Sequence, residues 1–170
     1  VQSQTIDHVK DGKVAAEACA SYLASGKFPT LALERAGFSG TSTGKKFFYD
    51  KHEKSVTGRY ITLTANSIKR GRMCYAQFKL RVKGTGGYDM AGVRALDDAF
   101  QTALVAKGYK KNVVKIEKGA QKGQESTRFV KGDSMYVFIH PSFSKALMDF
   151  DPFVVGFSPT SPNPRWWWRQ

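Results

Sequence analysis

The sequence contains no apolar run close to the ~20 residues that a membrane-spanning helix requires, so no segment is expected to cross a bilayer. Histidine is scarce, and His8, His52 and His140 stand far apart, without a second ligand at zinc-like spacing. The glycine-rich segment 84–92 lacks the G-K-[ST] ending of a phosphate-binding loop. The sequence therefore predicts no metal site and no cofactor.

Cysteine is also scarce, and its two positions are informative. Cys19 belongs to the apolar stripe of a predicted helix, and Cys74 points to the apolar side of a predicted strand. If that helix packs on that strand, the two residues form a disulfide, which implies an oxidising compartment, either a periplasm or the outside of a cell. The alternative is two free buried thiols, as in cytosolic proteins. A catalytic thiol is disfavoured because neither side chain is expected to reach solvent.

Apolar periodicity predicts the main elements. Two helices are expected over residues 12–25, with Asp11 as N-cap, and 90–107, with Asp89 as N-cap; shorter helices are expected over 28–37 and 141–150. Alternation of apolar and polar residues predicts strands, over 44–50, 58–65, 73–82, 113–118 and 135–140. The last of these strands is apolar throughout and is expected inside the sheet.

The order of these elements predicts an α+β fold. We expect a single domain over residues 1–157, in which a mainly antiparallel five-stranded sheet carries the two main helices on one face, in the order α-β-β-β-α-β-β. Residues 158–170 are expected to form a proline-rich tail outside the domain.

Positive charge is concentrated in one part of the chain. The formal net charge is +13, from 27 basic and 14 acidic residues, and segment 41–83 alone holds eleven basic residues against two acidic ones. Such a segment attracts polyanions, although a strand also needs polar side chains on its solvated face. The predicted binding residues on the basic sheet face are Lys69, Arg70, Arg72, Tyr75, Lys79, Arg81 and Lys83.

The tail ends in three adjacent tryptophans between arginines, namely Arg165, Trp166, Trp167, Trp168 and Arg169. This composition suits peripheral contact with a membrane interface, stacking on bases or anchoring in a groove of a partner protein. The alternative is that the tail covers the sheet of its own domain.

These features favour a non-enzymatic exported binding module that engages an acidic protein or an envelope polyanion through the basic sheet face. A nucleic-acid-binding domain using the same residues is the main alternative, and the inferred disulfide and the lack of a known motif disfavour it. An enzyme with a site near His140 is a further alternative, and no set of catalytic residues in the sequence points to it.

Overall fold

The computed structural model describes residues 6–115, 117–119, 122–123, 125–132, 134–139 and 153–159. Within these residues there are three helices, namely α1 (His8–Ser25), α2 (Thr30–Arg35) and α3 (Met90–Ala106). Eight strands are present in the same residues: β1 (Ser39–Thr43), β2 (Lys46–His52), β3 (Arg59–Ile68), β4 (Gly71–Phe78), β5 (Lys110–Lys115), β6 (Glu125–Lys131), β7 (Ser134–Ile139) and β8 (Phe153–Pro159).

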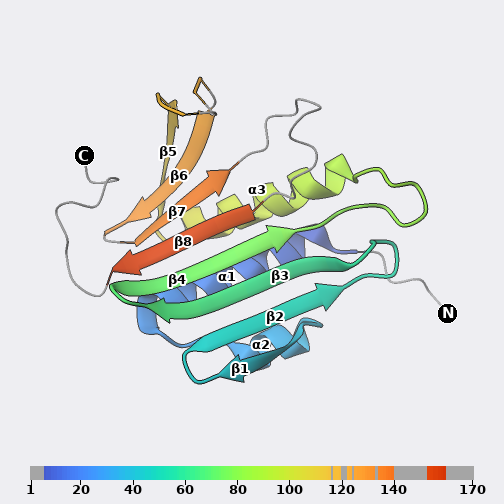
Figure 1. Ribbon diagram of the computed structural model, residues 1–170, viewed down its shortest axis with the longest axis horizontal. Coiled ribbons are helices and arrows are strands. Elements are labelled where there is room, and N and C mark those ends of the chain that lie inside the picture. Colours follow the sequence, from blue (N-terminus) through green and yellow to red (C-terminus); the bar gives the residue numbers. More distant parts are fainter. Residues whose placement is uncertain are drawn as a thin grey trace.

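The strands form one antiparallel sheet in the order β1-β2-β3-β4-β8-β7-β6-β5. Helices α1 and α3 lie side by side on one face of this sheet (Figure 1). The predicted α+β fold, with an antiparallel sheet and both main helices on one face, is confirmed. All five predicted strands are present as β2, β3, β4, β5 and β7, and β7 lies inside the sheet as expected.

Three strands were not predicted, and each has a local reason. Strand β1 has the polar sequence SGTST, exposed at every position, so it lacks apolar alternation. Strand β6 begins within the polar segment 119–126, which has no apolar alternation. Strand β8 contains Gly156 and ends at Pro159, two residue types that usually signal an irregular segment.

The helix α1 begins one turn earlier than predicted. Its N-cap is Asp7, whose side chain accepts a hydrogen bond from the Lys10 amide, and not Asp11. The helix ends as predicted at Gly26, which has the left-handed φ of 77° that glycine tolerates. Asp89 caps α3 as predicted by accepting a hydrogen bond from the Gly92 amide at 3.0 Å.

The core lies between the two long helices and the sheet. Its largest fully buried side chains come from both layers, namely Tyr22, Leu23, Leu33, Tyr60, Ile61, Leu63, Phe78, Leu80, Leu96, Phe100 and Phe129. The helices approach closely because α1 has Gly12 at the crossing, where a Cβ atom would lie 2.7 Å from the Leu96 carbonyl oxygen. His8, one turn before Gly12, likewise lies beside Gly92, one turn before Leu96. The helices α1 and α3 therefore run parallel and begin at the same end of the molecule.

The residues that flank β8 are only partly described. The predicted helix over 141–150, His140 and the residues Arg165, Trp166, Trp167, Trp168 and Arg169 lie outside the described residues. Strand β8 itself runs to Pro159, two residues past the expected domain boundary. No helix in the described part of the chain has the length and apolar character needed to cross a membrane.

Candidate functional site

The predicted disulfide joins α1 to β4. Cys19 and Cys74 are bonded with their Cα atoms 5.5 Å apart, and both are almost fully buried. These are the only cysteines of the chain, and neither is a free thiol. The bond is compatible with a protein exported to an oxidising compartment.

The predicted basic residues do not form one continuous surface. Lys69 and Arg70 lie in the turn between β3 and β4, whereas Lys79 and Lys83 lie beyond the other end of β4. Arg70 and Lys79 are nine positions apart in nearly extended chain, a distance of about 30 Å at 3.3 Å per residue. The structure therefore divides the predicted set between opposite ends of the sheet.

Tyr75 lies between these two ends, on the face of the sheet opposite the helices. It is half-buried, and its neighbours across the strands are Thr64 of β3 and Val155 of β8. Arg128 of β6 belongs to the same face by its register, and desolvation by burial lowers the pKa of its guanidinium group. This part of the face is mixed in character rather than continuously basic.

Arg72 is a correction to the predicted site, because it belongs to the opposite face of β4. It shares the helix-facing side of the strand with Cys74, and its Nη1 donates a hydrogen bond to the Leu23 carbonyl oxygen at 3.1 Å. The last turn of α1 has no basic residue of its own, so this strand residue supplies the positive charge that favours a helix C-terminus. Arg72 thus stabilises the helix end, and its side chain is directed toward α1 rather than to the face that carries Tyr75.

We expect the R72Q variant to lower the free energy of unfolding by about 1–2 kcal/mol, because it removes a charge-assisted hydrogen bond at a helix C-terminus. The R70Q variant is the matched control, since Arg70 is exposed and its loss should change stability by less than about 0.5 kcal/mol. Urea denaturation of both variants measures the difference. Equal stabilities for the two variants would contradict the helix-capping role.

A second cation serves the end of α3 in the same way. The Nζ atom of Lys131 donates a hydrogen bond to the Lys107 carbonyl oxygen at 2.6 Å and lies 5.8 Å from the centroid of the Tyr109 ring. Since α1 and α3 end at the same end of the molecule, Arg72 and Lys131 both compensate helix termini there.

Five other cations near the C-terminus of α1 form a group that we call the basic end. Its members are exposed, and none forms an ion pair with another residue of the described ranges; they are Lys27, Lys45, Lys46, Lys69 and Arg70. They come from the loop after α1, the turn between β1 and β2, and the turn between β3 and β4.

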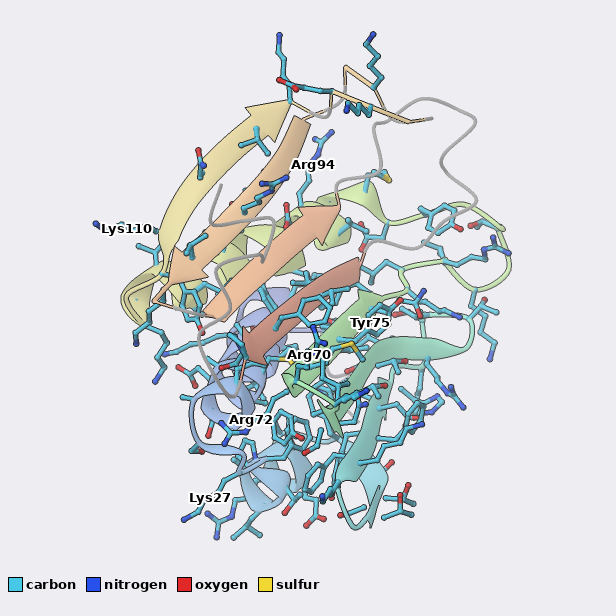
Figure 2. The ribbon with its side chains drawn as sticks, turned by 60° about the vertical axis from the view of Figure 1, so that its left-hand side comes forward. Lys27, Arg70, Arg72, Tyr75, Arg94 and Lys110 are labelled. Atoms are coloured by element: carbon cyan, nitrogen blue, oxygen red, sulfur yellow. A yellow bond between two sulfur atoms is a disulfide. The ribbon has the colours of Figure 1, made fainter. Side chains whose placement is uncertain are left out.

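Backbone contacts bring these three segments together. The Ser67 amide donates a hydrogen bond to the Lys45 carbonyl oxygen at 3.2 Å, and Ser67 pairs with Arg72 across β3 and β4. The guanidinium group of Arg72 in turn lies against Gly26, the residue before Lys27. Figure 2 shows Lys27, Arg72 and Arg70 along the same end of the molecule, where α1 finishes.

The opposite end holds a polar cluster that the sequence analysis missed. Asp11 is almost fully buried, and its Oδ1 accepts a hydrogen bond from the Lys51 ammonium at 2.9 Å. The Glu53 carboxylate lies 3.8 Å from the same ammonium. The sequence did contain a sign of this ion pair: Asp11 precedes Ala15 and Cys19 at helical spacing on the buried stripe. A carboxylate at a buried position needs a cation beside it.

A second set of contacts in this cluster ties α1 to β3 and α3. The His8 Nδ1 lies 2.9 Å from the Tyr60 hydroxyl, and the His8 Nε2 lies 3.7 Å from the Asp89 carboxylate. Burial, and after it the charge of Asp11, raises the pKa of Tyr60 far above its usual value. Tyr60 therefore remains a neutral phenol, and the contact between its hydroxyl and the His8 ring holds the start of α1 against β3.

This cluster joins both long helices to the sheet. Tyr60 is fully buried and Asp11 nearly so, and their partners come from α1, β2, β3 and α3. Across the described residues, no group of three histidine, cysteine or carboxylate side chains is placed to hold a metal ion. The cluster locks the helices onto the sheet at the end where both long helices begin.

Comparison with protein-family models, with curated proteins and with solved structures finds no match to this chain.

Proposed function

We propose that this protein is a non-enzymatic exported binding module that engages an acidic protein or an envelope polyanion through its basic end. The observation that carries the proposal is the presence of five exposed cations in three adjoining segments, with no carboxylate partner among the described residues. The field of such a group attracts polyanions without requiring a particular sequence or shape. The buried disulfide supports the exported location.

The basic end is a better candidate than the cations beyond the other end of β4. Arg81 there donates a hydrogen bond to the Tyr88 hydroxyl at 3.0 Å and lies 5.3 Å from the centroid of that ring. The end of the molecule that carries Arg81 also has buried and half-buried carboxylates, including Asp11, Asp50 and Glu53. These negative charges weaken the attraction of a polyanion to that end.

Binding to heparin, a soluble sulfated polyanion, tests the proposal. We expect the K69E/R70E variant to bind heparin at least roughly tenfold more weakly than the unaltered protein, because two attractive contacts become repulsive. The K54E/K83E variant is the matched control: it makes the same change in net charge at the opposite end, where the two loops meet through the Lys83 amide and the Ser55 carbonyl oxygen. It should bind nearly as well as the unaltered protein.

Two outcomes would contradict the proposal. An equal loss of affinity in both variants would show that only net charge matters and that the basic end is not a site. Binding to single-stranded DNA that survives physiological salt and falls steeply above it would favour the nucleic-acid alternative.

A further inference from the structure

Strand β8 ends beside the basic end. Pro159, the last residue of β8, pairs with Gly71, and Gly71 directly follows Arg70 in the sequence. The next eleven residues, 160–170, read TSPNPRWWWRQ. At 3.3 Å per residue their maximum reach is about 35 Å, so every residue of the segment stays within that distance of Pro159.

This segment has the composition of an interfacial membrane anchor. It contains all three tryptophans of the chain, flanked by Arg165 and Arg169, and it has no acidic residue. Tryptophan prefers the headgroup level of a bilayer because its ring is amphipathic. Each lysine or arginine near an anionic membrane surface adds about 1 kcal/mol of attraction. The two arginines therefore add to the five cations of the basic end.

The sheet offers apolar side chains next to the same turn. Met73 of β4 and Phe157 of β8 pair on the face opposite the helices. Two residues nearer the turn, Gly71 pairs with Ile68 on one side and with Pro159 on the other. All four apolar side chains are half-buried. A cationic rim beside apolar side chains is the arrangement by which proteins lie on membranes without crossing them.

From this juxtaposition we infer that the basic end and segment 160–170 together dock the protein on membranes that contain anionic lipids. The inference rests on the proposed function and names the class of its polyanion: lipids with phosphate headgroups and a net negative charge. A soluble polyanion uses only the cations, whereas a bilayer also accepts the tryptophans. Stable attachment to a membrane generally needs two such signals acting together.

Tryptophan fluorescence gives a specific test, because every tryptophan of the chain lies in the inferred anchor. We expect the emission of the full chain to shift to shorter wavelength with vesicles of phosphatidylglycerol and phosphatidylcholine in equal amounts, and not with phosphatidylcholine alone. The K69E/R70E variant should bind the anionic vesicles at least about thirtyfold more weakly, since the loss of two cations alone removes about 2 kcal/mol of attraction. The K54E/K83E variant should bind them like the unaltered protein.

A second variant separates this inference from the proposed function. The W166A/W167A/W168A variant should lose co-sedimentation with anionic vesicles while it retains heparin binding. If the unaltered protein binds heparin but not the vesicles, the membrane inference fails and the proposed function stands. An emission that is already at short wavelength without lipid, and unchanged by it, would show that the segment covers its own protein, and would also overturn the inference. Loss of heparin binding in K69E/R70E with vesicle binding unchanged would remove the basic end from the docking surface.

Discussion

Replacing Cys19 and Cys74 together by alanine is expected to lower the free energy of unfolding by about 4 kcal/mol. The bond closes a loop with a sequence separation of 55 residues, and in the chain-entropy model a loop of this length restricts the unfolded chain by that amount. The native state provides the geometry at little cost, because α1 already packs on β4 with the two Cα atoms 5.5 Å apart. Since domains are usually stable by only about 5–15 kcal/mol, the loss is a large part of the total.

Denaturation of the unaltered protein with and without reductant isolates the effect of the bond. The reduced protein keeps both sulfur atoms in the core, so its loss of stability reports the cross-link alone, whereas the double alanine variant also reports lost packing. The C19A/C74A variant should therefore be slightly less stable than the reduced protein. A difference below about 1 kcal/mol between the oxidised and reduced protein would be incompatible with the chain-entropy estimate.

The K51M variant is expected to lower the free energy of unfolding by about 3–5 kcal/mol, the usual effect of removing one partner of a buried ion pair. The Asp11 side chain is only 2% exposed and that of Lys51 17% exposed, so solvent cannot replace the lost ammonium. Methionine keeps most of the aliphatic length of lysine, so the loss reports the charge rather than a cavity. The Lys51 ammonium lies 2.9 Å from Asp11 Oδ1, so its removal takes the paired cation away from a buried carboxylate.

A double-mutant cycle checks the origin of this loss. The D11N/K51M variant removes both charges and should recover more than half of the stability lost in K51M. The K54M variant changes an exposed lysine in the adjoining loop and should have nearly unaltered stability. A K51M protein as stable as K54M would mean that Asp11 does not need its cation.

The helices and strands with clear apolar periodicity were predictable, because each depends on residues close in sequence. The alternation through Cys74, Ala76 and Phe78 identified the buried face of β4, and the stripe through Cys19 identified that of α1. These two local patterns placed both cysteines on buried faces, and the packing of α1 on β4 brings them together. Strand β8 was not predictable in this way, because the neighbouring strands β4 and β7 provide its hydrogen bonds despite its glycine and proline.

The candidate site was only partly predictable. The sequence identified Lys69 and Arg70 as basic, but not that the chain around Lys27 and Lys45 lies beside them. It did not show that Arg72 caps α1, because the predicted strand began at residue 73 and Arg72 was grouped with Tyr75 on the basic face. Composition reports how many charges a segment carries, whereas only packing decides which of them remain exposed.

The amino-acid sequence by itself determined the fold class and the buried faces of its main elements, including the two faces that carry the cysteines. Side-chain alternation and helical spacing are local properties, and they survive without knowledge of the rest of the chain. The tertiary structure alone decided which charges meet, since Asp11 and Lys51 are 40 residues apart and Leu23 and Arg72 are 49 apart. Those pairs depend on sheet register and on the packing of α1 against the sheet, and no short stretch of sequence contains either.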